Sequence, residues 1–190
     1  MYRFISIALL FVSFNVFAGL GDDFRELKDS GANYEVIGTV CEEVARLRFE
    51  EEFPSHQYEV TTGVEYSDGN RTLGELDVVV YERNTQAVVR VAEVKCWKNM
   101  RGALTKARSQ RQRFITNLQS NKAIYFRSLN STRQFKKSNF SKVREFLAVA
   151  QKGSRTAGFD RELPYQLDEL MKLRQMMLEC QRKHQCKRPQ

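Results

Sequence analysis

Apolar and polar residues alternate most clearly in the middle of the chain. Residues 74–81 read GELDVVVY, residues 87–95 read AVVRVAEVK, and a polar turn around Asn84 separates them. Two such runs with a short polar connection predict a pair of strands, at 73–81 and 88–96. Residues 58–66 alternate more loosely and end at the turn sequence Ser-Asp-Gly-Asn, so we expect a three-stranded antiparallel meander.

Apolar residues recur at helical spacing on both sides of the meander. Residues 34–53 predict a first helix that Pro54 ends, and residues 100–118 predict a second helix. The polar lead-in, residues 19–33, contains a shorter helical turn around 24–28. The run 122–128 predicts a buried strand, parallel to its neighbour because it follows a helical crossover.

The pattern becomes more polar beyond residue 128. Residues 129–139 predict an exposed basic loop, 140–151 a helix and 153–158 a linker, and Pro164 opens a last amphipathic helix. We therefore expect an α/β protein with a core at 34–128 and a tail at 129–190, whose basic loop and helices pack on the core. A chain of 190 residues is long enough for one domain of that kind.

The first eighteen residues have the pattern of a signal peptide. Arg3 precedes an apolar run, 4–16, and Ala18 ends a small-residue pattern that suits cleavage. The run is shorter than the ~20 residues that a membrane-spanning helix needs. Export to the periplasm or the medium is therefore expected, without stable membrane insertion, and a retained membrane anchor is the alternative.

Four cysteines follow residue 18, and export would permit two disulfides. Three pairings are open. Cys180 with Cys186 would close a short loop, and Cys41 with Cys96 would tie the first helix to the end of the last meander strand. The spacings match no zinc-site pattern, so a cysteine-bound metal is not expected.

The charges are divided along the chain. Residues 19–94 hold seventeen acids and seven bases, whereas residues 96–159 hold fifteen bases and one acid, Glu145. This division suits a phosphate polymer that one part of the protein holds and another part cuts. The alternative is a basic, solvated helical surface on an exported protein.

The meander also brings three charged residues to one end of the sheet. Asp77, Glu93 and Lys95 lie on one face if the two central runs pair as a hairpin. Two carboxylates and an ammonium are costly to desolvate there, and a divalent cation is the usual reason to tolerate them. The sequence therefore predicts a metal-dependent site at this end of the sheet.

Three motifs in this region resemble the PD-(D/E)xK nuclease superfamily, and most of all its Holliday-junction-resolvase and RecB-nuclease-like branch. Residues 38–45 are similar to that branch's Gly-x-x-x-Glu-x-x-Ala pattern, 74–77 to Gly-Glu-x-Asp and 93–95 to Glu-Val-Lys. Gln110 lies on the following helix, and Leu76 replaces the proline that names the superfamily. The resemblance covers about residues 34–128, and the tail has no match.

The resemblance implies a restriction-endonuclease-like core of helix, three-stranded antiparallel meander, helix and strand, followed here by additional C-terminal helices. It also implies a nuclease that hydrolyses phosphodiester bonds, with DNA as the expected substrate and Mg²⁺ or Mn²⁺ as the cofactor. Asp77, Glu93 and the Val94 carbonyl would bind the metal, and Glu42 would reach it through water. Lys95 would orient or deprotonate the attacking water. A homodimer is expected by analogy alone.

Several other residues are candidates for supporting roles. Gln110 would orient Lys95 or the phosphate, and Trp97 would stack on an unpaired base unless it belongs to the core. If the helix register differs, Glu43 replaces Glu42, and Glu75 would support Asp77. The candidate phosphate contacts are Arg108, Arg111, Arg113, Lys136 and Lys137.

Two other classes of protein remain open at this stage. One is a non-catalytic module that keeps the fold and binds nucleic acid or another polyanion. The other is a disulfide-stapled envelope protein, which would show no salt-dependent affinity for DNA.

Overall fold

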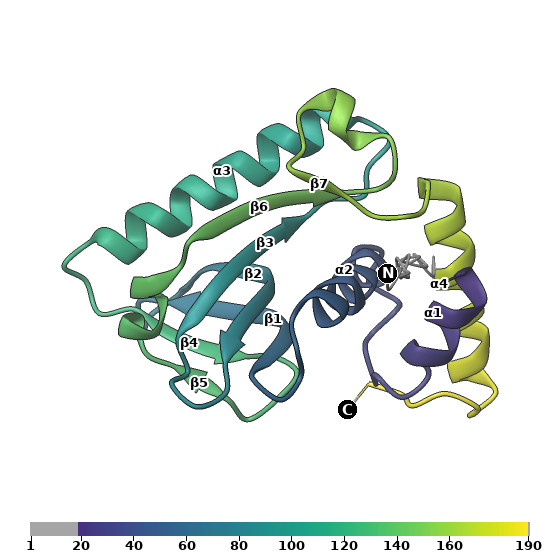
Figure 1. Ribbon diagram of the computed structural model, residues 1–190, viewed down its shortest axis with the longest axis horizontal. Helices are drawn as coiled ribbons and strands as arrows, with labels where there is room; N and C mark the ends of the chain where they lie inside the picture. The colour runs from purple at the N-terminus through teal and green to yellow at the C-terminus, as the bar shows by residue number, and fades with distance from the viewer. Residues whose placement is uncertain (1–18, 190) are drawn as a thin grey trace, which may run out of the picture.

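A mixed β-sheet forms the centre of the computed structural model, which describes residues 19–189; the predicted signal peptide lies outside the described residues (Figure 1). The strand order in the described sheet is β5-β4-β1-β2-β3-β6-β7. The strands are β1 (Tyr58–Ser67), β2 (Thr72–Glu82), β3 (Val88–Val94), β4 (Tyr125–Ser128), β5 (Gln134–Phe135), β6 (Glu145–Ala150) and β7 (Arg161–Glu162). The predicted meander of β1, β2 and β3 is confirmed, because both of its pairings are antiparallel.

Helices cover both faces of the sheet. The α-helices are α1 (Leu20–Leu27), α2 (Thr39–Glu52), α3 (Met100–Gln119) and α4 (Leu167–Arg182), and two 3₁₀ turns are η1 (Lys137–Lys142) and η2 (Ser154–Ala157). Figure 1 shows α3 along one face, and α2 on the other side with α1 and α4 packed beyond it. The apolar core is divided in the same way, with Val78 and Val80 facing α2 and Val79 on the opposite face. The predicted α/β class is confirmed.

The first predicted helix is shorter than its apolar pattern suggested. Residues 34–38 form turns instead, because the Asn33 side chain accepts a hydrogen bond from the Glu35 N–H at 3.1 Å. Gly38 is then the N-cap of α2. Glu42 therefore lies in the first turn of this helix rather than near its middle.

The predicted parallel strand at 122–128 is wrong in direction. β4 pairs antiparallel with β1, with Tyr66 opposite Phe126. The reason is tertiary packing, because α3 leads the chain past the sheet to a position beside β1 instead of β3. Aromatic packing of Tyr66, Phe114 and Phe126 against Phe140 then buries the new edge.

The predicted helix at 140–151 is also wrong. These residues contain β6, which pairs parallel with β3 and places Val149 opposite Val94. The segment 129–139 is not wholly an exposed loop either, because Phe135 in β5 is buried. The sheet therefore extends beyond residue 128, and β6 supplies the strand that follows the helical crossover.

Both disulfides named from the sequence are confirmed. Cys41 is bonded to Cys96, and Cys180 is bonded to Cys186. The described helices include none that has the length and apolar character of a membrane span.

Candidate active site

The site lies where two central strands separate. The ladder between β2 and β3 runs as far as the pair Val78 and Ala92, and beyond it the strands diverge. The Asp77 carboxylate enters the opening and accepts a hydrogen bond from the Val94 N–H at 2.7 Å. A buried backbone N–H needs an acceptor, so Asp77, which is 6% exposed, replaces the missing strand partner.

Lys95 completes a compact ionic cluster. Its Nζ lies 2.7 Å from Asp77 Oδ2, 3.0 Å from the Val94 carbonyl oxygen and 3.5 Å from Glu93 Oε2. Burial alone would lower the pKa of Lys95, but the negative charges of Asp77 and Glu93 outweigh it and raise the pKa. The structure thus brings together the three residues that the meander was expected to place on one face.

Glu93 of this cluster and Glu42 of α2 are carboxyl groups in surroundings with excess negative charge. Burial, followed by the charge of Asp77, raises the pKa of Glu93 to about 9. Burial, then Asp77 and Glu75, raises the pKa of Glu42 to about 8. Glu93 Oε2 is also buried without a hydrogen-bond partner among the described residues. The site therefore holds more carboxylate than its own cations neutralise.

Local sequence explains how Glu42 reaches the site. A Cβ atom at Gly38 would lie 3.0 Å from Glu42 Oε1, so glycine leaves room for this carboxylate at the start of α2. The disulfide from Cys41 to Cys96 links the residue before Glu42 to the residue after Lys95. Two parts of the site that are far apart in sequence are thus held together covalently.

The alternative residue Glu43 faces another environment. Its carboxylate accepts hydrogen bonds from Thr62 Oγ1 and from Arg46 Nε, both at 2.9 Å. These contacts fix α2 to β1 and do not include Asp77 or Lys95. The structure therefore favours Glu42 as the acidic residue of α2 at the site. Glu75 is close enough that burial and the charge of Asp77 raise its pKa, as expected for a supporting group.

Helix α3 contributes from the other side of the sheet. Gln110 Oε1 is buried and lacks a hydrogen-bond partner among residues 19–189, and the structure shows no bond between Gln110 and Lys95. The Arg113 guanidinium lies within electrostatic reach of both Tyr66 and Glu93. Arg113 therefore lies close to the carboxylate cluster, and its predicted contact with phosphate stays a prediction.

Sequence analysis missed Tyr66, which separates the site from the aromatic core. Burial raises the pKa of Tyr66, against the effect of Arg113. A Cβ atom at Gly74 would come within 2.5 Å of the Tyr66 hydroxyl oxygen. The glycine of the Gly-Glu-Leu-Asp motif thus admits a buried tyrosine, and this glycine was the signal that could have pointed to it.

Of the other residues predicted to contact nucleic acid, some are exposed and some contact other parts of the protein. Arg108 and Lys136 are exposed, whereas the Arg111 guanidinium lies 5.7 Å from the centre of the Phe146 ring. Lys137 donates to the backbone carbonyl groups of residues 120 and 122 and so anchors its own turn. Trp97 is 45% exposed, which argues against a place in the core.

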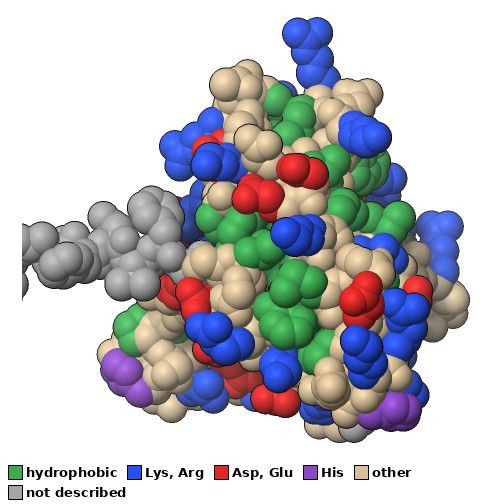
Figure 2. Space-filling view, turned by 90° about the vertical axis from the view of Figure 1, so that its right-hand side faces the viewer, with side chains coloured by type: hydrophobic (Ala, Val, Ile, Leu, Met, Phe, Trp, Pro, Cys, Tyr) green, Lys and Arg blue, Asp and Glu red, His purple; other side chains and the backbone are tan. Residues whose placement is uncertain are grey.

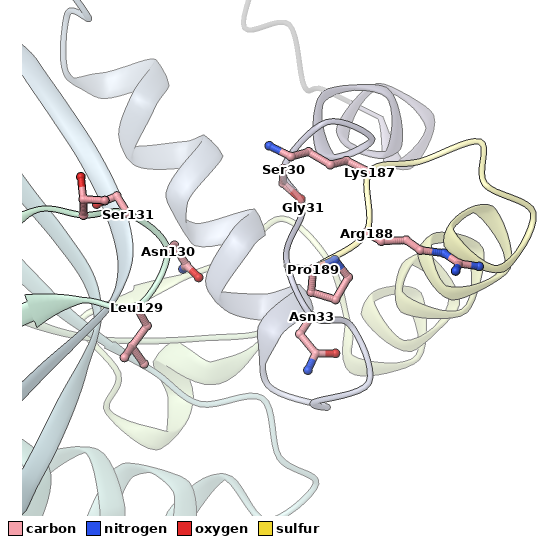
Figure 3. Close-up of a pocket in the computed structure, with 10 residues that line it drawn as sticks. Ser30, Gly31, Asn33, Leu129, Asn130, Ser131, Lys187, Arg188 and Pro189 are labelled. Carbon is pink, nitrogen blue, oxygen red and sulfur yellow. The ribbon is translucent and has the colours of Figure 1, made fainter.

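Charges of both signs are interspersed around apolar side chains on the face that carries α1 and α4 (Figure 2). That face therefore lacks the uniform positive field that would hold a polyanion by charge alone. Figure 3 shows a polar hollow of about 430 Å³ at the same end, between Asn130, Asn33 and the tail at Pro189. Arg188 points away from it and donates to the carbonyl oxygen of Gln181. None of the predicted catalytic residues lines this hollow.

The donors suit a hard divalent cation, although their present arrangement is that of an ion pair. Within residues 19–189, no three His, Cys, Asp or Glu side chains converge closely enough to hold a metal ion. Asp77 is engaged by Lys95 instead. Oxygen ligands are nevertheless what Mg²⁺ and Mn²⁺ prefer, and Glu93 Oε2, whose Lys95 partner is as far away as 3.5 Å, is an oxygen of that type.

Comparison of the chain with protein-family models, with curated proteins and with solved structures found no match in any of the three. The function must therefore be argued from the site itself.

Proposed function

We propose that this chain is an exported, metal-dependent nuclease that hydrolyses phosphodiester bonds, with DNA as the expected substrate. The observation that carries the proposal is the convergence of Asp77, Glu93 and Lys95 at the diverging ends of β2 and β3, with Glu42 facing them from α2. Buried acids with strongly raised pKa values cluster at functional sites, and the nearby Lys95 and Glu42 give this cluster the composition of one.

Each residue has a distinct role in this proposal. Asp77, Glu93 and the Val94 carbonyl would bind Mg²⁺ or Mn²⁺, and Glu42 would hold a water molecule beside the ion. The bound ion would polarise the phosphoryl group and lower the pKa of a water molecule. The Lys95 ammonium, fixed by Asp77 and the Val94 carbonyl, is placed to orient that water and to counter the charge on the reacting phosphate.

The order of elements supports the same class of nuclease core. Helix α2, the meander of β1 to β3 and helix α3 follow the expected order, whereas the next strand, β4, is antiparallel and the parallel strand is the later β6. β6 takes the place that the sequence pattern gave to residues 122–128. The turn-rich segment between α3 and β6 adds β4 and the edge strand β5.

The two disulfides are compatible with export, because disulfides persist in oxidising compartments. Delivery to the periplasm or to the medium is part of the proposal.

A cleavage assay tests the proposal directly. The oxidised protein is incubated with circular DNA, linear DNA and RNA, in Mg²⁺, in Mn²⁺ and with chelator. Lys95→Ala is expected to reduce metal-dependent cleavage by about 100-fold or more, while Lys183→Ala, the same change at an exposed residue at the end of α4, should leave it unchanged. Absence of cutting by folded protein in every metal, or equal activity of Lys95→Ala, would refute the nuclease.

One observation favours a second candidate, a non-catalytic module that binds nucleic acid or another polyanion. The Lys95 ammonium already satisfies Asp77 at 2.7 Å, as it would in a site without a metal. Such a module would bind DNA with an affinity that falls steeply with salt, and Lys95→Ala would change its stability rather than any cleavage. The same protein samples therefore distinguish the two functions.

A further inference from the structure

A second pocket lies just beyond the candidate active site. Its volume is about 450 Å³, and it is a hollow open to solvent that is lined by the start of α4, the end of β6 and the segment that follows β3. That volume is within the range of about 300–1,000 Å³ that is usual for small-molecule sites. The residues that matter here are Lys98, Met100, Gln151, Lys152, Leu167 and Met171.

Gln151 lines this pocket and carries an unpartnered acceptor that is closed to solvent, so a ligand reaches it only when the side chain shifts. The side chain is 4% exposed, and its Nε2 donates to the Trp97 carbonyl oxygen at 2.8 Å. A carbonyl only accepts, so this bond also fixes which amide atom is nitrogen. The other atom, Oε1, is buried and has no hydrogen-bond partner among the described residues. A buried acceptor in that state is costly unless a ligand supplies a donor.

The other walls define what kind of donor fits. Met100, Leu167 and Met171 are half-buried and form an apolar surface, whereas Lys98 and Lys152 are exposed cations at its edge. An aromatic ring with an amino group, carried on a phosphate chain, matches the apolar wall, the acceptor of Gln151 and the cations at the edge. Lys98 follows Lys95 by three residues, so its Cα lies within about 10 Å of the Lys95 Cα.

We propose that this pocket receives an unpaired nucleobase of the substrate strand, adjacent to the phosphate that is cut; the inference rests on the proposed nuclease function. The base would lie against the methionine and leucine side chains and donate its exocyclic amino group to Gln151 Oε1. Asp168 adds a carboxylate acceptor at the rim. Adenine, cytosine and guanine are therefore preferred over thymine, which has no exocyclic amino group.

A base can enter such a pocket only when it is not paired within a duplex. The proposal therefore also specifies the substrate class: single-stranded DNA, or the single-stranded end of a duplex, is preferred over an intact duplex.

Binding to short oligonucleotides tests the pocket without relying on cleavage. The probes are fluorescein-labelled oligothymidylates that carry one central dA or dC, with plain oligothymidylate as the reference, in chelator. We expect the wild-type protein to bind the substituted probes about fivefold or more tightly, as measured by fluorescence anisotropy. Met171→Glu places a charge on the pocket wall and should abolish that preference. Met176→Glu, on the same helix but away from the pocket, should retain it.

Gln151→Leu provides a second variant, because it removes the acceptor while keeping the side-chain volume similar. It should lose the preference for dA and dC while its affinity for plain oligothymidylate stays the same, and thermal unfolding verifies that it is folded. Equal binding of all probes by the wild-type protein, or a preference that survives both variants, would refute the proposal that this pocket receives a base.

Cleavage of the same probes in Mg²⁺ separates this inference from the function on which it rests. Cutting without any base preference would support the proposed nuclease function and refute the proposed role of the pocket. A base preference in binding without any cutting would retain the pocket and refute the nuclease. Cutting at a fixed distance from the single dA, lost in Met171→Glu, would support both.

Discussion

The disulfide between Cys41 and Cys96 should stabilise this protein more than the disulfide between Cys180 and Cys186. The first joins residues 55 apart in sequence and the second joins residues 6 apart. In the chain-entropy account, closing these loops raises the free energy of the unfolded state by about 4 and about 2 kcal/mol, respectively. A domain of this size has a free energy of unfolding of about 5–15 kcal/mol, so the stabilisation by the disulfide that closes the longer loop is a large fraction of the total.

The assay compares two matched double variants by urea denaturation of folded, oxidised protein. Cys41→Ala with Cys96→Ala should reduce the free energy of unfolding by about 4 kcal/mol, and Cys180→Ala with Cys186→Ala by about 2 kcal/mol. The chemical change is the same in both pairs, so loop length is the main difference. Equal losses, or a larger loss for the short loop, would refute the reasoning.

The same pair of variants also tests the geometry of the site. Cys41 precedes Glu42 and Cys96 follows Lys95, whereas Cys180 and Cys186 belong to the end of α4 and its tail. At a temperature where both variants are folded, cleavage should therefore fall only in the variant without the longer link. A matching fall in both would show that the link does not position the catalytic residues.

Two further predictions concern acids outside and inside the site. Glu43→Gln removes the charge that pairs with Arg46, which keeps its second partner Glu50, and should cost about 1.5 kcal/mol of stability in urea denaturation. Glu42→Gln should leave stability intact and abolish cleavage. The reverse pattern would show that the roles of the two acids are misassigned. Burial would raise the pKa of Glu52, but hydrogen bonds from two arginines of β3 and β7 outweigh it and lower the pKa. The stability that Glu52 contributes is therefore present above its ordinary pKa and lost as the pH falls through the lowered value. Glu52→Gln should make the free energy of unfolding fall less on acidification. An unchanged dependence of that free energy on acidic pH would contradict this.

The central hairpin and its charged residues could be predicted because they depend on local pattern. Alternation sets which residues share a face, and the short polar turn sets the partner strand, so Asp77, Glu93 and Lys95 were placed together correctly. The separation of β2 from β3 beyond Val78 could not be predicted. It depends on the side chain of Asp77 competing for a backbone N–H group, which no periodicity records.

The errors beyond residue 128 have a different physical origin. Residues 145–150 read EFLAVA, an apolar run without alternation, and a strand buried in a parallel ladder has the same composition as a buried helix. The direction of β4 was wrong because sequence order does not say which edge of the sheet a returning chain will reach. Both errors concern long-range pairing, and neither moved a residue of the candidate site.

Asp77 has a structural role that any protein with this fold would need. Its carboxylate accepts from the Val94 N–H and the Lys95 ammonium. Removing it would leave a buried donor unpaired, at a cost of about 1–3 kcal/mol. Asp77 would therefore be kept by a nuclease and by a non-catalytic module alike, and loss of activity in an Asp77 variant would not distinguish catalysis from folding.

Glu93 is different, and it is the residue that favours the nuclease. It is 4% exposed, and burial and the charge of Asp77 act against its ionisation more strongly than the Lys95 ammonium, 3.5 Å from Oε2, favours it. A module that only binds a polyanion gains nothing from a buried acid beside another acid, since burying an ionisable group there destabilises the fold. A divalent cation turns the same two acids into ligands. In the proposed nuclease, metal binding would account for the cost in stability that Glu93 imposes, which binding to a polyanion alone would not.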